Sequence, residues 1–236
     1  MSSNFANTQP NIGAFSQAKE LQKKILFVIF ALIVYRLGTF IPIPGINSDI
    51  FQEIFSQNAG GLLGMFDMFV GGAVQRMSIF ALGVMPYISA SIIMSLLTHV
   101  NPSLSQLKKD GGELGRQKIN QITHYIMIPI ALLQAWGQLT LLNQAGVFDT
   151  LDFGLNFITL TIMISMVAGT VFLVWIGELI SERGLGNGVS LIIFGGIVAN
   201  LPTMLGQGLY MQNAMGSIIV LVIFTAIIIF TIVLFS

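Results

Sequence analysis

The side chains that most often carry out catalysis or bind metals are few in this sequence. It contains no cysteine and two histidines, His99 and His124, which excludes disulfides and cysteine-based metal or redox sites. Neither histidine has a glutamate at metal-ligand spacing, and no His-Glu-x-x-His or Gly-x-Ser-x-Gly motif is present. Glu178 and Glu182 would share one helix face, but they stand beside Arg183 at the edge of an apolar run, where solvated charge explains them. We therefore expect no enzyme, no cofactor and no metal site.

A glycine-rich stretch, Gly184-Leu-Gly-Asn-Gly188, could be mistaken for a phosphate-binding loop. It lacks the Gly-Lys-Ser/Thr ending and the preceding strand of such loops. Because it lies between two apolar runs, we interpret it as a tight turn in which Asn187 caps the following helix. Without a nucleotide site, the energy for any transport would come from a partner.

Branched aliphatic side chains on the run 77–98 are the next candidates for a function. On a helix, one narrow face of this run would hold Met77, Ala81, Val84, Ile88, Ser91 and Ser95. Branched aliphatic side chains can form a constriction that wets poorly and offers ions no ligand. A helix packed through small residues, with serines bonding back to its own backbone, would explain the same pattern without a pore. Gly83 and Pro86 weaken a helix near the middle of the run.

A shorter apolar segment, 62–70, comes just before this run and is too short to cross a bilayer. It carries a single charge, Asp67, and glycines bracket or interrupt it. It is either a re-entrant loop packed as structure or a movable stopper, for which glycine supplies backbone freedom and methionine a soft surface. Non-helical backbone at membrane depth is tolerated only where protein covers it or where it lines a cavity. We interpret the two segments together as the wall and stopper of a pathway.

The composition places these segments in a membrane protein. The 236 residues are 54% hydrophobic and 8% charged, whereas soluble domains are about 25% charged. We predict six spans, with a polar loop at 101–121, a loop at 143–152, a tight turn at 178–188 and an uncharged loop at 202–214. The predicted spans are 25–41, about 77–98, about 122–142, about 155–176, about 189–201 and 217–235.

Lysine and arginine indicate the orientation of the chain, because they concentrate in cytoplasmic loops. With six spans, all the basic segments fall on one side, which places the N-terminal tail 1–24 in the cytoplasm. The basic loop at this face faces anionic lipid or docks an acidic or RNA-rich partner. It holds Lys108, Lys109, Arg116 and Lys118.

Charged residues in or near the spans and the two ends of the chain give further expectations. Arg36 is charged and lies well inside the first span, so we expect it to be a structural anchor paired with Asp49 or Glu53, while Asp67 and Arg76 stabilise the outer face. We see no cleavable signal peptide and expect the first span to serve for targeting. The last span stops without a basic flank, and we expect a longer native chain.

Four stretches resemble the SecY family of bacterial protein-conducting channels. Tyr35-Arg-Leu-Gly-Thr-Phe-Ile-Pro-Ile-Pro-Gly45 is similar to the end of its first span, and Met65-Phe-Asp-Met-Phe-Val-Gly-Gly72 to its plug. The run from Ser78 to Ile93 resembles its second span, and the turn from Gly177 to Gly188 its fourth-to-fifth turn. The likeness is collinear and corresponds to about the first half of a SecY chain.

The resemblance implies an all-α polytopic fold with six transmembrane helices and a re-entrant plug half-helix, the first half of an inverted repeat. Residues 25–205 would be the five-span N-terminal half, with the plug at about 60–74, and 206–236 an outer loop and a truncated sixth span. The implied pore ring is Val84, Ile88 and Ile193. The implied plug is Leu62, Leu63, Met65, Phe66, Asp67, Met68, Phe69 and Val70, and the implied lateral gate is Ser89, Ser91, Ser95 and Gln134.

The same resemblance implies a gated polypeptide channel in the bacterial inner membrane. Its partners would be SecE, SecG, the SecA ATPase, the ribosome, secretory polypeptides and membrane lipid, with no specific nucleic acid sequence. Two other classes remain open from the residues alone. A secondary transporter of a small solute would need a polar or charged midplane site, and an intramembrane enzyme would need paired catalytic groups.

Overall fold

The computed structural model describes residues 12–44, 55, 62–144 and 156–211. These residues are helical apart from turns, irregular connections and one isolated antiparallel bridge between Pro42 and Ser78. The described helices are α1 (Ile12–Gly38), α3 (Leu62–Phe69), α4 (Met85–Val100), α5 (Pro102–Asp110), α6 (Gly112–Gln144), α7 (Phe157–Arg183) and α8 (Gly188–Met211). The expected all-α character is therefore confirmed for the described residues.

Two of the described helices, α6 and α7, are long and apolar enough to cross a membrane. The count of six spans stays a prediction, because the expected sixth span, 217–235, lies outside the described residues. Asp49 and Glu53, the expected partners of Arg36, also lie outside them.

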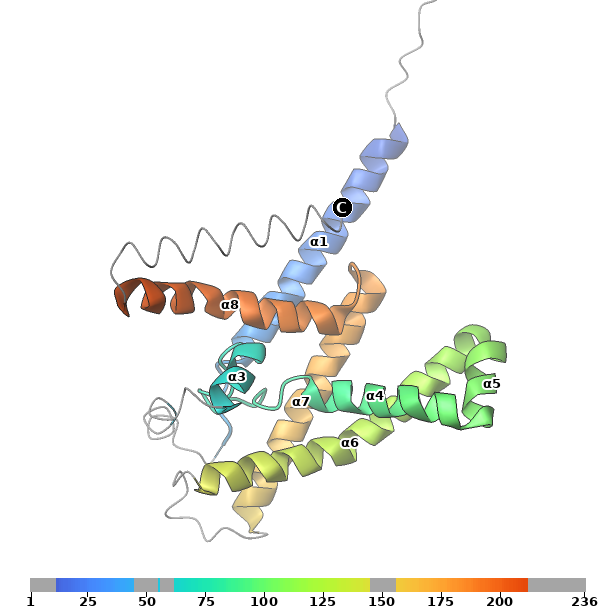
Figure 1. The fold of residues 1–236 in the computed structure, drawn as a ribbon. Coiled ribbons are helices and arrows are strands. Elements are labelled where there is room, and N and C mark those ends of the chain that lie inside the picture. The colour runs from blue at the N-terminus through green and yellow to red at the C-terminus, as the bar shows by residue number, and fades with distance from the viewer. Residues whose placement is uncertain (1–11, 45–54, 56–61, 145–155, 212–236) are drawn as a thin grey trace, which may run out of the picture.

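The helices form a hairpin packed against a second group (Figure 1). α4 and α6 lie side by side and are joined at one end by the short helix α5. α7 packs against α6 on one side and against α1 and α8 on the other, and α3 packs against α8. The helix α3 thus rests on the second group of helices, α1, α7 and α8, while the α4–α6 hairpin contacts that group through α7.

The expectation of a helix from residue 77 is wrong, because α4 begins at Met85. The chain before it turns repeatedly: Met77, Gly72 and Gly83 all have positive φ, at 43°, 82° and 58°. Pro86 then stands in the first turn of α4, where its missing N–H costs no hydrogen bond. The proline begins this helix and does not kink it, so Met77 and Ala81 do not share a helix face with Ile88.

The non-helical segment 70–84 is covered by protein. Most of its residues are buried, and Ala73, Val74, Met77 and Phe80 are at most 1% exposed. Its backbone groups are paired locally, for example Ser78 N to Ala73 O at 2.9 Å, and with the residues just after α1, for example Ile43 N to Met77 O at 2.9 Å. Irregular backbone in an apolar environment needs such pairing, because each unsatisfied group costs several kcal/mol.

Two predicted loops are also wrong. Residues 102–110 form α5, because the side chain of Asn101 accepts a hydrogen bond from Ser103 N at 3.0 Å and a proline follows it in the first turn. At the other end of the chain, α8 continues through Pro202 to Met211, where the sequence predicted an uncharged loop.

Candidate functional site

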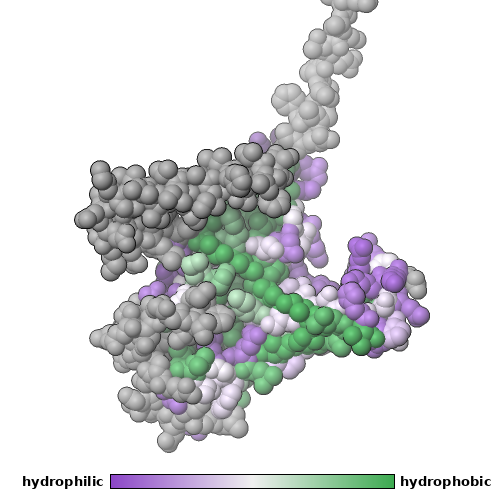
Figure 2. Space-filling model, in the orientation of Figure 1, coloured by the Kyte–Doolittle hydropathy of each residue, from purple (hydrophilic) through white to green (hydrophobic). Residues whose placement is uncertain are grey.

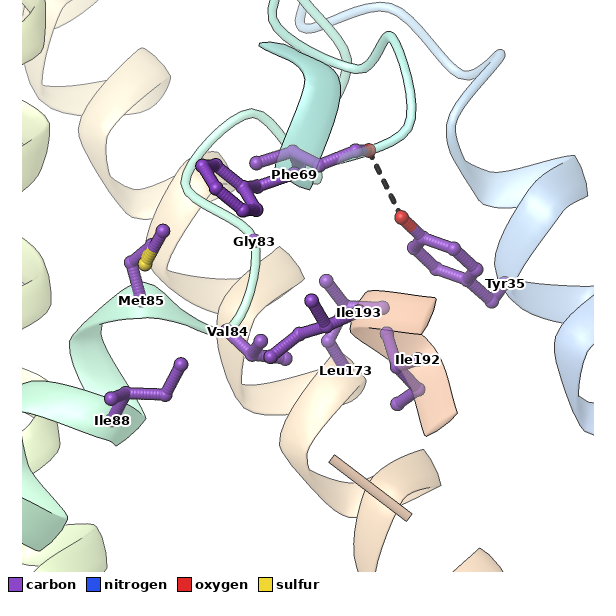
Figure 3. A pocket seen from close by; sticks show the side chains of 10 residues that line it. Tyr35, Phe69, Gly83, Val84, Met85, Ile88, Leu173, Ile192 and Ile193 are labelled. Carbon is purple, nitrogen blue, oxygen red and sulfur yellow. Dashed lines mark hydrogen bonds between the residues drawn. The ribbon is translucent and has the colours of Figure 1, made fainter. Parts of the chain in front are cut away.

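A cavity of about 190 Å³ lies where α1, α4, α7, α8 and the chain after α3 meet. It is lined by Tyr35, Phe69, Val70, Gly83, Val84, Met85, Ile88, Leu173, Ile192 and Ile193. The structure thus brings together the three predicted ring residues, although Ile193 is more than a hundred positions from Val84 and Ile88 in the chain. Figure 3 shows Val84, Ile88 and Ile193 on the two sides of this space, with Phe69 above them.

Local backbone geometry places Val84 at the cavity. Gly83 has φ +58°, and a Cβ at this position would stand 3.1 Å from both methyl groups of Val70. Val84 is the residue before α4, and its carbonyl accepts the first bond of that helix from Ile88 N at 3.1 Å. A glycine is therefore needed both for the turn and for the close approach of Val70. Val84 and Ile88 lie one helical turn apart on the same wall.

The last residue of the predicted plug is inserted into the packed interior. Val70 is 5% exposed and belongs to a cluster with Val84, Phe80, Leu173 and Ile192. Asp67 lies within the predicted plug, where its carboxylate accepts a hydrogen bond from Gln75 N at 2.8 Å. This carboxylate therefore caps the turn that follows α3.

The other predicted plug residues are described less completely. Met68 is half-buried and Phe69 is exposed. The remaining four lie on the α3 helix, and their side chains are outside the described ones: Leu62, Leu63, Met65 and Phe66.

The end of α1 holds the turn between α3 and the segment that follows. Tyr35 is 2% exposed, and its hydroxyl donates to the Val70 carbonyl at 2.9 Å (Figure 3). The guanidinium of Arg36 donates to the carbonyl of the next residue, Gly71. Both bonds join residues 35 positions apart, so the turn is fixed by a different helix.

Phe40 lies beneath two cations. The Arg76 guanidinium lies 4.3 Å from the centre of its ring and that of Arg36 at 5.4 Å. Arg76 Nη1 has no hydrogen-bond partner among the residues that the structure describes. An aromatic face can stabilise a partly desolvated cation by about 0.5 to 2 kcal/mol. Arg76 therefore lies at the predicted outer face with an aromatic neighbour.

The four predicted gate residues do not line one cavity. Ser89 and Gln134 face each other at 3.4 Å between α4 and α6 and line a second cavity of about 440 Å³ that is otherwise mostly apolar. Ser91 and Ser95 line a third, open cavity of about 600 Å³ between α4, α5 and α6. The gate prediction therefore corresponds to two places along the α4–α6 hairpin.

The predicted basic residues lie at the α5 end of this hairpin. All four side chains are exposed, and Lys108 and Arg116 also line the third cavity. Figure 2 shows polar side chains gathered over this end, next to an apolar surface along α4. The apolar surface includes Ile92, Ile93, Leu96, Leu97 and Val100, all of them exposed.

Sequence reasoning missed two sets of contacts. The ring of Tyr35 stacks on Phe80 with centroids 6.2 Å apart. On the other side of the molecule, Asn120 Nδ2 at 2.7 Å and His124 Nε2 at 3.2 Å both approach one oxygen of Glu178, joining α6 to α7. No periodicity in the sequence pairs residues so far apart. For the second set alone, polar side chains at the ends of predicted spans were a signal.

The residues described so far define a class of protein: a predominantly helical chain with helices long and apolar enough to cross a membrane, whose irregular centre lines a mostly aliphatic cavity. The family model described as SecY matches residues 78–236. The chain is 53% identical over 188 residues to the protein translocase subunit SecY of Pseudomonas aeruginosa, covering 80% of this chain and 42% of that protein. It is 50% identical over 202 residues to the subunit of the same name from Escherichia coli strain K12, covering 82% and 44%.

The chain therefore belongs to the SecY family, and the resemblance seen in its motifs is confirmed. It spans less than half the length of these relatives. A solved structure described as "The structure of a protein conducting channel" has a TM-score of 0.49 and 18% sequence identity, and the match covers 80% of this chain and 37% of that one.

Proposed function

We propose that this chain is the N-terminal part of the pore subunit of a bacterial Sec translocase. It would pass unfolded secretory polypeptides across the inner membrane and release apolar segments sideways into lipid. The N-terminus would lie in the cytoplasm. In this proposal the ring is Val84, Ile88 and Ile193, α3 with Val70 is the plug, and the α4–α6 hairpin forms one wall of the lateral gate.

One observation supports the proposal above all others. Three branched aliphatic side chains, from the start of α4 and from α8, meet at one cavity, and Phe69 at the end of α3 and the next residue, Val70, line it from another side. An aliphatic constriction dewets and blocks ions, and it can widen around a polypeptide without binding a particular sequence. The plug rests on the ring through apolar contact, and glycines follow it.

Membership of the SecY family also supports a proposal about partners. SecE, SecG, the SecA ATPase and the ribosome are the proposed partners, with the exposed cations Lys108, Lys109, Arg116 and Lys118 contributing to the cytoplasmic face. Ser89 and Gln134 supply polar groups to the proposed gate wall. Of the four proposed gate residues, these two lie nearer the ring, because their cavity shares Val70 and Met85 with the ring cavity.

A small-solute transporter is the less supported function. Such proteins place polar or charged groups at a midplane site. Among the ten residues that line the ring cavity, Tyr35 alone has a polar side chain, and its hydroxyl is already bonded to Val70. The lining offers a solute almost no polar contact.

The test uses the full-length gene product reconstituted in proteoliposomes with its motor ATPase. Protease protection of a presecretory polypeptide measures translocation, and ion flux measures the resting seal. Val84→Ser, Ile88→Ser and Ile193→Ser should each raise resting ion flux and relax signal-sequence discrimination, because a hydroxyl wets the constriction. Ile128→Ser, at an exposed position on α6, is the control and should leave both unchanged.

Two results would overturn the proposal. One is a resting seal that stays intact in all three ring variants. The other is uptake of a small solute that is lost in these variants while the polypeptide is never protected.

A further inference from the structure

We propose that Tyr35 and Arg36 form a latch that holds α3 in the closed position. They are positioning residues: they act on the plug and not on the polypeptide. The inference rests on the proposed function, because it assigns to the end of α1 the control of the proposed plug.

The latch lies on the α3 side of the point where the chain can bend. Gly71 and Gly72 have φ of 71° and 82°, a region that glycine enters without steric cost. The Val70 and Gly71 carbonyls, which accept the bonds from Tyr35 and Arg36, come before or within this pair. A movement of α3 about Gly72 therefore has to break both bonds.

The two bonds differ from the local bonds of the turn. Gly72 N donates to Asp67 O, and Gln75 N to the Asp67 carboxylate, so these bonds join α3 to residues a few positions further on. Tyr35 and Arg36 instead tie α3 to a helix that packs against α7 and α8. They fix the plug relative to the wall of the channel.

Several contacts hold the side chain of Tyr35 in place. Its ring stacks on Phe80 with an interplanar angle of 18°. A Cβ on Gly71 would stand 3.0 Å from the Tyr35 hydroxyl, and a Cβ on Gly196 would stand 3.0 Å from both this hydroxyl and the Phe69 carbonyl oxygen. Gly196 on α8 and Gly71 in the turn thus leave just enough room for the Tyr35 hydroxyl. The donor of the hydrogen bond to the Val70 carbonyl is therefore already oriented.

Tyr35→Phe tests the latch with the loss of one oxygen atom, because phenylalanine keeps the ring and its stacking on Phe80. In planar bilayers, the full-length protein carrying Tyr35→Phe should show a resting open probability about two to ten times higher, the factor expected for one hydrogen bond. The matched control is Tyr125→Phe, where the tyrosine is 75% exposed on α6. It should behave like the unmodified protein.

A second measurement reports the position of α3 directly. Nitroxide labels on Met68 of α3 and Phe194 of α8, in a protein freed of any cysteine beyond residue 236, give their distance distribution. Tyr35→Phe should add a second, longer distance, whereas a merely structural role for Tyr35 would lower the unfolding temperature without adding it. Gly196→Ala, which crowds the hydroxyl without removing it, should act in the same direction and serves where Tyr35→Phe folds poorly.

Each outcome decides the matter. If deletion of residues 61–70 raises the resting conductance while Tyr35→Phe and Gly196→Ala match Tyr125→Phe in both measurements, the latch is wrong and the proposed plug stands. If the deletion leaves the conductance unchanged, the plug assignment and the latch both fail. A lower unfolding temperature with unchanged conductance and distances would reduce Tyr35 to a structural residue and overturn the latch.

Discussion

Val70 should determine how firmly the proposed plug closes the channel. Its side chain is 5% exposed and packs with Val84 and Phe80, so an opening that lifts α3 would transfer nearly the whole side chain into the water-filled pore. Val70→Ala removes two methyl groups, each worth about 0.8 kcal/mol when buried. The closed state should lose about 1.6 kcal/mol, which is a factor of about 15 in the open-to-closed ratio.

The assay is the resting open probability of the full-length protein in planar bilayers at low voltage, without motor or substrate. Val100→Ala is the matched control, because this valine is 80% exposed at the end of α4 and its truncation should change nothing. An open probability for Val70→Ala equal to that of Val100→Ala, in a protein whose α3 deletion does leak, would refute the idea that burial of Val70 holds the plug.

Two further predictions concern the scaffold around the site. Gly169→Ala on α7 should lower the unfolding temperature in detergent, because its Cβ would stand 2.0 Å from the Ile79 carbonyl oxygen. Gly137→Ala in α6, with nothing within 4 Å of its Cβ, should instead raise stability by about 0.5 to 1 kcal/mol. Equal unfolding temperatures for the two variants would contradict this packing. Glu178→Ala should destabilise the α6–α7 contact by about 1 kcal/mol, because Asn120 and His124 lose their shared acceptor. The same change at exposed Glu182, in the last turn of α7, should not destabilise the protein, because a carboxylate there opposes the helix dipole. Chemical denaturation of both variants would show the difference, and equal midpoints would refute it.

Hydropathy in the sequence predicted much of the helical framework. The apolar runs that became α1, α6, α7 and α8 could be located because a buried or lipid-facing helix needs a long stretch without charge. The glycine-rich turn before α8 was also predictable, since Asn187 and its glycines suit a helix start. Asn187 indeed accepts a hydrogen bond from Ser190 N at 3.2 Å.

The same method failed where the chain is apolar but not helical. Residues 77–84 read as the start of a span, yet Met77 and Gly83 adopt positive φ and the helix begins at Met85. Hydropathy measures the affinity of a segment for an apolar environment and not its backbone path. Pro86 was informative, but it marked a helix start and not a kink, a distinction that depends on which backbone groups are paired nearby.

The candidate site was predictable in part, through resemblance to a family and not through local sequence patterns. Val84, Ile88 and Ile193 were chosen by resemblance, and they do line one cavity; their role as a seal stays a prediction. Ser91 and Ser95 were grouped with Ser89 as polar groups of one gate, but positions 89 and 91 lie about 200° apart around a helix, and these serines line different cavities. The bond from Tyr35 to Val70 joins residues from different elements, and a single sequence carries no signal for it.

The central proposal is that a polypeptide crosses the membrane through the ring of Val84, Ile88 and Ile193. A photoreactive amino acid placed at each ring position in the full-length protein, together with a stalled presecretory polypeptide, would measure this contact. Crosslinks to the polypeptide are expected at all three positions and not at Leu133, which is 73% exposed on α6. A protected polypeptide that crosslinks at none of the ring positions would contradict the proposal.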